Sequence, residues 1–490
     1  MLWNEIKELA KQRPDDIAIL GEEKTYTYQE LVSWVNVIST FLARYQHKVL
    51  ALFCDNSPEW LLVDLAANVS EVTLLPLPAF FSNQQLAFAI EKSGACGLVH
   101  KRDDSLSKVT ELLNTEVLIG DLLCSDLKKV ADSELPVSTA KITFTSGSTG
   151  QPKGVCLSNQ QQFAVAKAIQ DSLQLPAGKH LSVLPFSTLL ENTAGSYVTL
   201  LNGGTIIALP SNQLGFNGSS DFKLSTLLKT IEHYKPVSLI LLPEILLGIV
   251  GAIKKGWTLP SSIAFMAVGG SKVSEQLIQQ AQACGLPVYE GYGLSECASV
   301  VSLNSAKNNK AGSVGKPLPH LEVRIVNNEI IVSGNSFLGY VGEPASWEKS
   351  EVGTGDLGFF DEEGYLYVNG RKKNLLISSY GRNISPEWVE GVLLSDGLLK
   401  QCVVFGDQRP NCVALISLRN NAMSEESISD SIIKANRSLP DYAQVKKWAV
   451  LPQLMSFSKG TMTSNGRPVR DAILKQYQST INQLYAELGQ

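Results

Sequence analysis

Short β-type runs alternate with helical patterns over most of the first 300 residues, and this alternation constrains the fold more than any other feature. A β-type run at 49–53 is followed by a helical pattern at 58–68 and by a second apolar run at 72–75. Further β-type runs with helices between them lie at 181–184, 205–209, 238–242, 264–268 and 288–289. This pattern predicts an α/β fold in which parallel sheets are covered by helices.

The pattern changes after residue 320, where short alternating runs at 321–325, 329–332 and 365–368 indicate antiparallel strands or a small β-barrel. After Arg371 the chain resembles a compact α+β unit that ends in one charged helix over 468–488. At 490 residues the chain exceeds a single core. We therefore expect a large N-terminal domain over 1–370, with two helix-covered α/β sheets plus a small β-barrel. A small mobile α+β domain over 371–490 follows it.

Composition and charge narrow the class of protein. The net charge is −5, which gives no electrostatic basis for binding nucleic acid. The eight cysteines form no CxxC pair, so reduced thiols fit better than a disulfide framework or a zinc site. Residues 1–5 lack the pattern of a secretion signal, and Pro243 and Glu244 interrupt the longest apolar stretch. We expect a cytoplasmic enzyme with no nucleic-acid partner and no transmembrane segment.

The run 145–155, TSGSTGQPKGV, follows the strand-like residues 142–144 directly. Glycines let backbone N–H groups approach an anion, hydroxyls add donors, and Lys153 supplies a positive charge. The Walker order GK[ST] is absent, and the alternative is a flexible Gly/Ser linker. The run predicts a phosphate-binding loop made of Thr145, Ser146, Gly147, Ser148, Thr149, Gly150 and Lys153.

Two further stretches carry polar groups at positions suited to a nucleotide. Residues 289–296, YEGYGLSE, follow a β-type run, so they lie where open α/β sheets bind ligands. Glycines on both sides of Tyr292 allow close packing on a flat ring, and Glu296 can hold Mg²⁺. In the run 354–358, Asp356 can accept two hydrogen bonds from vicinal hydroxyls. A tight turn with a core tyrosine, or an ordinary Asp–Gly turn, is the structural alternative.

Together these stretches resemble the adenylate-forming superfamily, which includes acyl-CoA synthetases, peptide-synthetase adenylation domains and firefly luciferase. The resemblance implies that Tyr292 stacks on adenine and that the Ser295 hydroxyl meets the α-phosphate and the carboxylate. Glu296 and Thr149 would bind the metal. Outside the phosphate loop, we expect ten more residues to contact the nucleotide or to take part in catalysis. They are Gly269, Gly270, Glu290, Gly291, Tyr292, Gly293, Ser295, Glu296, Asp356 and Arg371.

The C-terminal part departs from the superfamily at one position. Residues 463–470, TSNGRPVR, are similar to T-x-x-G-K-x-x-R, with Arg467 in place of the lysine that contacts the substrate carboxylate and ATP. Arginine keeps the charge but is planar and bulkier. We expect either a slower first half-reaction or help from Lys459. The resemblance also makes Lys373 the hinge and Gly381 part of the pantetheine tunnel, although Gly381 equally fits a turn before a helix capped at Ser385.

Residues 184–192, LPFSTLLEN, align with the superfamily's acyl-pocket segment P-L-x-H, with Thr188 at the histidine position. No aspartate stands where members that activate amino acids hold one, so we expect an uncharged acid. The small residues Ala194 and Gly195 leave room for an acyl chain, and the segment resembles long-chain fatty acyl-CoA synthetases. The predicted acid-binding residues are Phe186, Thr188, Ala194 and Gly195.

The resemblance thus implies an acid–thiol ligase that uses ATP, Mg²⁺ and coenzyme A. It would convert a medium- or long-chain fatty acid to acyl-AMP with release of pyrophosphate, and then transfer the acyl group to the coenzyme A thiol. One alternative is an acyl-AMP ligase that loads an acyl-carrier protein. A second, motivated by Arg467, is a non-catalytic nucleotide-binding homologue. An oxygenase of the luciferase kind shares the fold.

Overall fold

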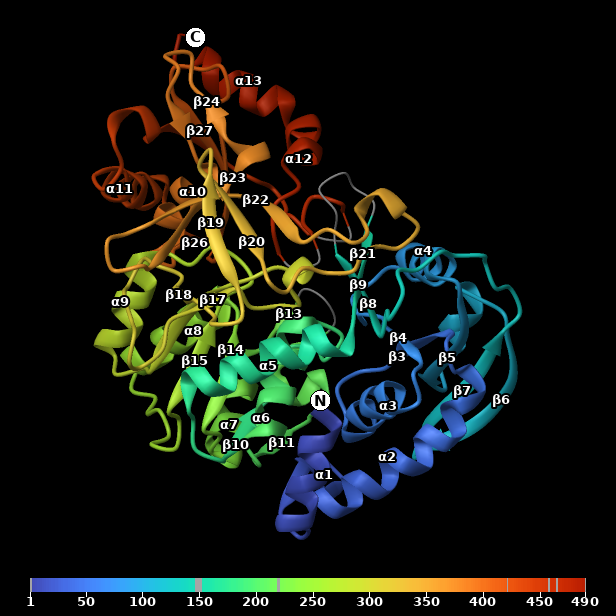
Figure 1. Cartoon of the computed structure of the whole chain (residues 1–490). Helices are drawn as coiled ribbons and strands as arrows, with labels where there is room; N and C mark the ends of the chain where they lie inside the picture. Colours follow the sequence, from blue (N-terminus) through green and yellow to red (C-terminus); the bar gives the residue numbers. More distant parts are fainter. Residues whose placement is uncertain are drawn as a thin grey trace.

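The computed structural model describes residues 2–145, 152–217, 221–420, 422–456, 459–463 and 466–489. Figure 1 shows two helix-covered sheets side by side, one built by the blue strands and one by the green strands. A group of yellow strands adjoins the second sheet, and the orange and red C-terminal segment lies at the top of the view. Each sheet is built largely from its own stretch of the chain.

The first sheet has, among the described residues, eight strands in the order β21-β9-β8-β4-β3-β5-β7-β6. Its inner strands are parallel, whereas β7, β6, β9 and β21 are antiparallel to their neighbours. Every residue of β4 is buried, as a strand covered on both faces requires. The strands are β3 (Val49–Phe53), β4 (Thr73–Pro76), β5 (Ala95–Lys101), β6 (Leu112–Ile119), β7 (Leu122–Leu127), β8 (Lys141–Thr145), β9 (Lys153–Leu157) and β21 (Gly339–Tyr340).

The second sheet follows the order β18-β17-β16-β15-β14-β10-β11-β1-β2 in the described part of the chain. Its strands from β1 to β16 are parallel, and only β2, β17 and β18 at the edges are antiparallel. Leu241, Val268 and Glu290 pair across three neighbouring strands, so the carboxyl ends of these strands meet at one edge. The strands are β1 (Ile17–Leu20), β2 (Thr25–Thr27), β10 (Lys179–Leu181), β11 (Thr205–Ile207), β14 (Ser238–Leu241), β15 (Phe265–Val268), β16 (Val288–Tyr292), β17 (Ser302–Leu303) and β18 (Lys316–Pro317).

Two smaller sheets follow. Strands β19 (Glu322–Val326), β20 (Glu329–Ser333), β22 (Glu351–Phe360) and β23 (Leu366–Arg371) form an antiparallel sheet. The C-terminal part holds β26 (Leu399–Phe405), β27 (Cys412–Leu418) and β28 (Val445–Val450). Short pairs join β12 (Phe216–Asn217) to β13 (Asp221–Phe222), and β24 (Leu376–Ile377) to β25 (Asn383–Ile384).

The helices begin at residues that the sequence marks clearly. Ser57 and Ser385 each cap a helix whose first residue is proline, and Ser158 forms a capping box with Gln161. The helices are α1 (Leu2–Gln12), α2 (Tyr28–Leu42), α3 (Pro58–Val69), α4 (Asn83–Ser93), α5 (Asn159–Leu173), α6 (Val198–Leu201), α7 (Leu224–Tyr234), α8 (Pro243–Lys254), α9 (Glu275–Ala283), α10 (Pro386–Leu394), α11 (Glu425–Asn436), α12 (Arg470–Gln476) and α13 (Gln478–Ala486). A π-helical segment, η3 (Leu190–Tyr197), precedes α6.

The predicted α/β class is confirmed, and three details of the prediction were wrong. The expected barrel is an open four-stranded sheet in the described residues, because its strands pair in the linear order β19-β20-β22-β23. The expected C-terminal helix is two helices, since Tyr477 leaves the helical conformation (φ −114°, ψ 22°). The strand expected at 181–184 ends at Leu181. Beyond it, buried side chains replace a neighbouring strand: Asn56 donates to the Leu184 carbonyl, and Glu191 accepts the Leu184 N–H.

Candidate active site

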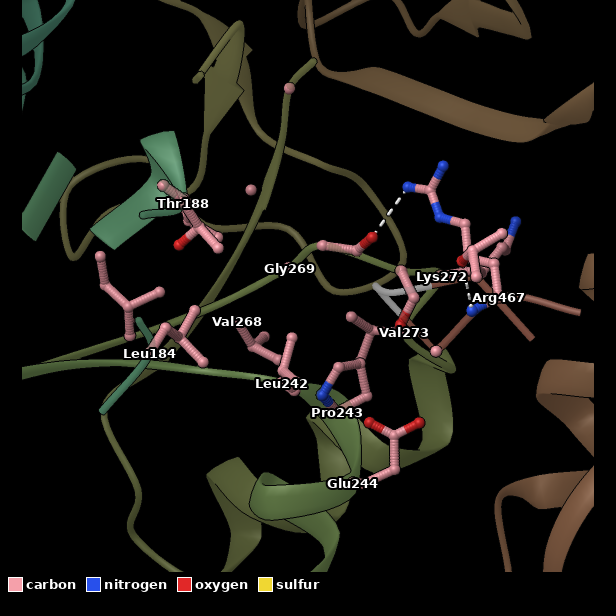
Figure 2. Close-up of a pocket in the computed structure, with 18 of the residues that line it drawn as sticks. Leu184, Thr188, Leu242, Pro243, Glu244, Val268, Gly269, Lys272, Val273 and Arg467 are labelled. Atoms are coloured by element: carbon pink, nitrogen blue, oxygen red, sulfur yellow. Dashed lines mark hydrogen bonds between the residues drawn. The ribbon is translucent and has the colours of Figure 1, made fainter. Parts of the chain in front are cut away.

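A cavity of about 2140 Å³ lies against the carboxyl ends of β14, β15 and β16. Its walls come from the second sheet, from the four-stranded sheet and from the C-terminal part of the chain. Figure 2 shows Leu184 and Thr188 on one side of the pocket and Lys272 and Arg467 on the other. Segments far apart in sequence thus meet at the sheet edge where α/β folds bind ligands.

Tyr292, Asp356 and Arg371 form a connected polar group in this cavity. The Tyr292 hydroxyl donates to Asp356 Oδ2 at 2.7 Å, and Arg371 Nε lies 2.7 Å from Asp356 Oδ1. Asp356 and Arg371 face each other across the β22–β23 pair, which brings carboxylate and guanidinium together. Asp356 is buried, and burial raises its pKa against the opposing effect of Arg371. The arrangement fixes a hydrogen-bonding carboxylate beside an aromatic ring.

Glycines make the backbone around Tyr292 close-packed. A Cβ at Gly293 would overlap the Ser299 carbonyl, and one at Gly269 would lie 3.0 Å from the Gly291 carbonyl. Gly270 has φ +84°, a conformation that glycine adopts readily. The Gly269–Gly270 turn and the Gly291–Gly293 segment therefore approach each other with no side chain between them. A flat ring can lie on this backbone.

Two charged side chains, Lys153 and Glu296, have partners that the sequence analysis missed. The Tyr340 hydroxyl donates to Glu296 Oε1 at 2.9 Å, and Lys153 Nζ lies 3.2 Å from Glu343 Oε2. The Lys153 ammonium also lies 4.5 Å from the centre of the Tyr340 ring. Thr145 pairs with Lys153 across β8 and β9, so these two residues lie side by side on neighbouring strands. Nothing local in the sequence around 340–343 links that segment to this site.

Glu290 and Lys272 line the cavity near the Gly269–Gly270 turn. Burial raises the pKa of Glu290 to about 8, and the nearby Lys272 opposes this shift. Burial lowers the pKa of Lys272, whose ammonium donates to the Val368 carbonyl at 2.7 Å. Lys272 thereby joins the loop after β15 to β23. Its contact with the four-stranded sheet could not be read from sequence spacing.

Arg467 reaches the cavity from the C-terminal part. Its Nη2 donates to the Gly270 carbonyl at 2.8 Å, a contact drawn in Figure 2. The loop that carries it is anchored by Arg470, whose Nη2 lies 2.7 Å from both carboxylate oxygens of the buried Glu390. Although Arg467 keeps exposed surface at the cavity, desolvation lowers its pKa, as does the neighbouring Arg371. The guanidinium therefore lies close to the Tyr292–Asp356–Arg371 group.

Of the two predicted residues Lys373 and Gly381, only Lys373 lines the cavity. Lys373 lines the cavity in the turn η7 (Lys372–Asn374), and burial lowers its pKa. Gly381 lies outside the cavity lining, in a turn with φ +73° whose N–H donates to the Ser378 carbonyl. In this arrangement Arg467, and not the Gly381 turn, lies near the Tyr292–Asp356–Arg371 group.

The part of the cavity between η3 and the second sheet, here called the inner arm, is largely apolar. Side chains alternate along a strand, so Leu239 and Leu241 pack in the core with α7 to α9, although Leu239 also borders the cavity, whereas Ile240 faces the inner arm. Thr188, Ala194 and Gly195 line the opposite wall. Other apolar lining residues are Ile169, Leu173, Leu190, Val198, Phe265 and Ala267.

Phe186 is a correction to the predicted acid-binding set. Its ring is buried 5.4 Å from that of Trp60 in α3, and it is absent from the cavity lining. Asn56 holds the same segment, because its Oδ1 accepts the Phe186 N–H at 2.7 Å while its Nδ2 donates to the Leu184 carbonyl at 2.9 Å. The packing of this segment decides where Phe186 points.

Predicted residues Ser146, Gly147, Ser148, Thr149 and Gly150 lie outside the described residues. Within the described ranges, no group of three or more His, Cys, Asp or Glu side chains could hold a metal ion by itself. Glu296 fits a magnesium ion shared with phosphates, since only Oε1 is engaged by Tyr340. Over the same ranges, no helix is long and apolar enough to cross a bilayer.

Comparison with known proteins gives consistent results. Residues 6–339 match the family described as AMP-binding enzyme, and residues 373–489 match the AMP-binding enzyme C-terminal domain. The long-chain-fatty-acid–CoA ligase FadD15 of Mycobacterium bovis is 23% identical over 89% of this chain and 88% of its own length. A 2-succinylbenzoate–CoA ligase of Bacillus cereus is 29% identical, over 92% and 95%.

Among solved structures, O-succinylbenzoate coenzyme A synthetase from Bacillus subtilis, in complex with ATP and magnesium ion, gives a TM-score of 0.76. The match covers 96% of this chain and 98% of that one, at 24% identity. The architecture described above is therefore that of this structure.

Proposed function

Because the chain belongs to the AMP-binding enzyme family, we propose that it is an AMP-forming acid–thiol ligase that activates a carboxylic acid and passes the acyl group to coenzyme A. The sequence-based predictions of the family, the enzyme class and the ligands ATP, Mg²⁺ and coenzyme A are confirmed by the relatives and by the ATP- and magnesium-bound structure. The roles of individual residues and the identity of the acid are part of the proposal.

The observation that carries the proposal is the convergence of Tyr292, Asp356, Arg371, Glu296 and Arg467 on one cavity. We assign the adenine ring to the Tyr292 face and to the Gly269–Gly270 backbone, and we call this part of the cavity, with Asp356, Arg371, Glu296 and Arg467, the nucleotide end. Asp356, oriented by Tyr292 and Arg371, accepts hydrogen bonds from the ribose hydroxyls. Glu296 holds Mg²⁺, which when bound supplies positive charge to the phosphate oxygens.

Attack of a carboxylate on the α-phosphate needs charge neutralisation and alignment more than covalent help. Lys153, Arg371 and Arg467 supply fixed positive charge around the site, and Ser295 also lines it. Carboxylate oxygen and α-phosphorus form a bond while pyrophosphate leaves, giving acyl-AMP. The thiol of coenzyme A then displaces AMP. We propose that residues 371–490 rotate about Lys373 between these steps, which would exchange Arg467 for the Gly381 turn.

For the acid we propose a medium- or long-chain fatty acid. The inner arm offers an apolar wall along Ile240, Phe265 and Ala267, and the residues that line it in the described structure include no lysine or arginine. A second carboxylate on the substrate would need such a cation, because a buried unpaired charge is costly. This argument favours the reaction named for FadD15 over the one named for the 2-succinylbenzoate ligases.

The test is pyrophosphate release from Mg·ATP with a panel of fatty, aryl and dicarboxylic acids, without and then with coenzyme A. Release with fatty acids that rises on adding coenzyme A supports the proposal. Release unaffected by coenzyme A would point to an acyl-carrier protein as acceptor. ATP binding without release for any acid would favour the non-catalytic alternative and make Arg467→Lys the next variant.

A further inference from the structure

A hydrogen-bonded chain of three polar side chains lies beside the otherwise apolar inner arm, near the amino ends of β10 and β14. Ser238 Oγ lies 2.9 Å from His180 Nδ1, and His180 Nε2 lies 2.8 Å from Glu191 Oε1. The other Glu191 oxygen accepts the Leu184 N–H at 3.0 Å. The side chains of His180 and Glu191 are 4% and 0% exposed, and Ser238 and His180 both line the cavity. None of the steps described above uses these groups.

The position of this chain is set by strand register. Ser238 pairs with His180 on one side and with Phe265 on the other, three residues before Leu241 and Val268. At about 3.3 Å per residue, Ser238 lies about 10 Å from the strand ends that border the nucleotide end. Ser238 and Ile240 share a face of β14, so an acyl chain that lies along Ile240 points its far end at Ser238.

At this end, Gly195 lies between the His180–Glu191 pair and the cavity. Gly195 in η3 lines the cavity, and a Cβ at that position would lie 2.5 Å from Glu191 Oε1 and 2.6 Å from His180 Nε2. The polar chain is therefore covered on this side only by a residue without a side chain. Thr199 and Asn202 line the cavity in the segment that follows. Polar groups are concentrated at the far end, whereas the walls before it are apolar.

The partners of His180 suit the tautomer that carries its proton on Nε2. In the tautomer with its proton on Nε2, the His180 ring donates to the Glu191 carboxylate, which only accepts, and presents a lone pair at Nδ1. The Ser238 hydroxyl then donates to Nδ1, which leaves only its oxygen lone pairs directed elsewhere. With His180 in this tautomer, a ligand group that meets Ser238 donates a hydrogen bond to its oxygen.

We infer that Ser238, held by His180 and Glu191, binds a hydrogen-bond donor at the far end of the acid, namely a hydroxyl group. This inference rests on the proposed function and narrows its substrate class to medium-chain acids that carry a hydroxyl at or near the end remote from the carboxylate. Ser238 contacts the substrate, whereas His180 and Glu191 are positioning residues. A site that hydrogen-bonds a substrate hydroxyl discriminates strongly against the analogue that lacks it.

The experiment uses the wild-type enzyme and three series of acids of increasing length: unsubstituted, ω-hydroxy and dicarboxylic. The readout is kcat/KM for pyrophosphate release. At the best length, the hydroxy acid should exceed the unsubstituted acid by at least about 10-fold. Equal or higher activity with the unsubstituted acid at every length overturns the inference and leaves the proposed function intact. A preference for the dicarboxylic acid overturns it too, since a carboxylate offers no donor. No release with any acid overturns the proposed function itself.

A variant pair separates recognition from folding. Ser238→Ala should lower kcat/KM for the hydroxy acid to the value for the unsubstituted acid, with the KM for ATP unchanged. The matched control is Ser262→Ala, which removes a half-buried hydroxyl that donates to the Pro236 carbonyl outside the cavity lining. The control should keep the preference. Retention of the preference in Ser238→Ala would overturn the assignment to Ser238.

Discussion

The nucleotide end and the inner arm of the cavity are built in different ways. At the nucleotide end, polar groups come from short contiguous stretches, such as 290–296 and 354–356, and several are already paired with one another. The inner arm is assembled from single residues of α5, η3, β10, β14 and β15, and most of them are apolar. Under the proposed function, the first end binds one ligand through fixed polar contacts, and the second binds its ligand through shape and the single hydrogen bond inferred for Ser238. Substitutions at the two ends should therefore fail in different ways.

The largest expected effect is the pH dependence of stability caused by Glu290 at the nucleotide end. Its pKa is about 8 in the folded protein and near 4.5 in the unfolded chain. The folded state therefore keeps a proton that the unfolded state loses between these values, so stability falls as pH rises from 4.5 to 8. The contribution amounts to about 3–5 kcal/mol across this window. Glu290→Gln should flatten the dependence, as measured by urea unfolding at several pH values.

The control for Glu290 is Glu343→Gln, which removes a half-exposed carboxylate that pairs with Lys153. That variant should keep the slope of the wild type. An unchanged slope in Glu290→Gln would contradict the buried, proton-retaining state of this carboxyl.

Next in size is the loss of the carboxylate that joins Tyr292 to Arg371. Asp356→Ala leaves the Arg371 guanidinium without its partner and removes the group proposed to meet the ribose. We expect kcat/KM for pyrophosphate release to fall about 100- to 1000-fold, with a raised KM for ATP. The KM for the acid should change little. Glu351→Ala, which breaks an exposed ion pair with Arg324 on the same strand β22, is the control and should act near wild type. An effect on the acid alone would argue against the assigned role.

The contrast between the two ends also explains what the sequence could predict. Tyr292, Glu296 and Asp356 stand in stretches whose order carries the chemistry, and all three line the cavity. The inner arm depends on strand register and on which face of β14 points inward, neither of which a local pattern specifies. Phe186 was therefore assigned to the pocket, although Asn56, about 130 residues away in sequence, holds its backbone in a position that buries its ring.

Two replacements of Arg467 test the role of its charge at the nucleotide end. Arg467→Ala removes a cation and its bond to the Gly270 carbonyl, so formation of acyl-AMP should slow by about 100-fold. Arg467→Lys keeps the charge and should remain within about 10-fold of the wild type. Single-turnover assays would follow acyl-AMP formation and, separately, coenzyme A transfer from synthetic acyl-AMP. Equal slowing of both steps in Arg467→Ala would contradict a role confined to the first.

The smallest expected effect is in the inner arm. There, adding a single methyl group at Gly195 tests how closely the side chains pack. In Gly195→Ala the new Cβ would lie about 2.5 Å from Glu191 Oε1 and 2.6 Å from His180 Nε2, so the two side chains must separate. Overpacking of this kind costs about 1–3 kcal/mol of stability. It should raise the KM for the acid several-fold and leave the KM for ATP unchanged, because the Tyr292–Asp356 group lies at the other end of the cavity.

The matched control is Gly251→Ala in α8, where a Cβ meets nothing within 4 Å. Replacing glycine by alanine within a helix should stabilise the protein slightly at that position. Thermal unfolding and the two KM values together decide the outcome. If Gly195→Ala raised the KM for ATP as much as that for the acid, the two ends of the cavity would be mechanically coupled. The division between a nucleotide end fixed by paired polar groups and an inner arm fixed by packing would then fail.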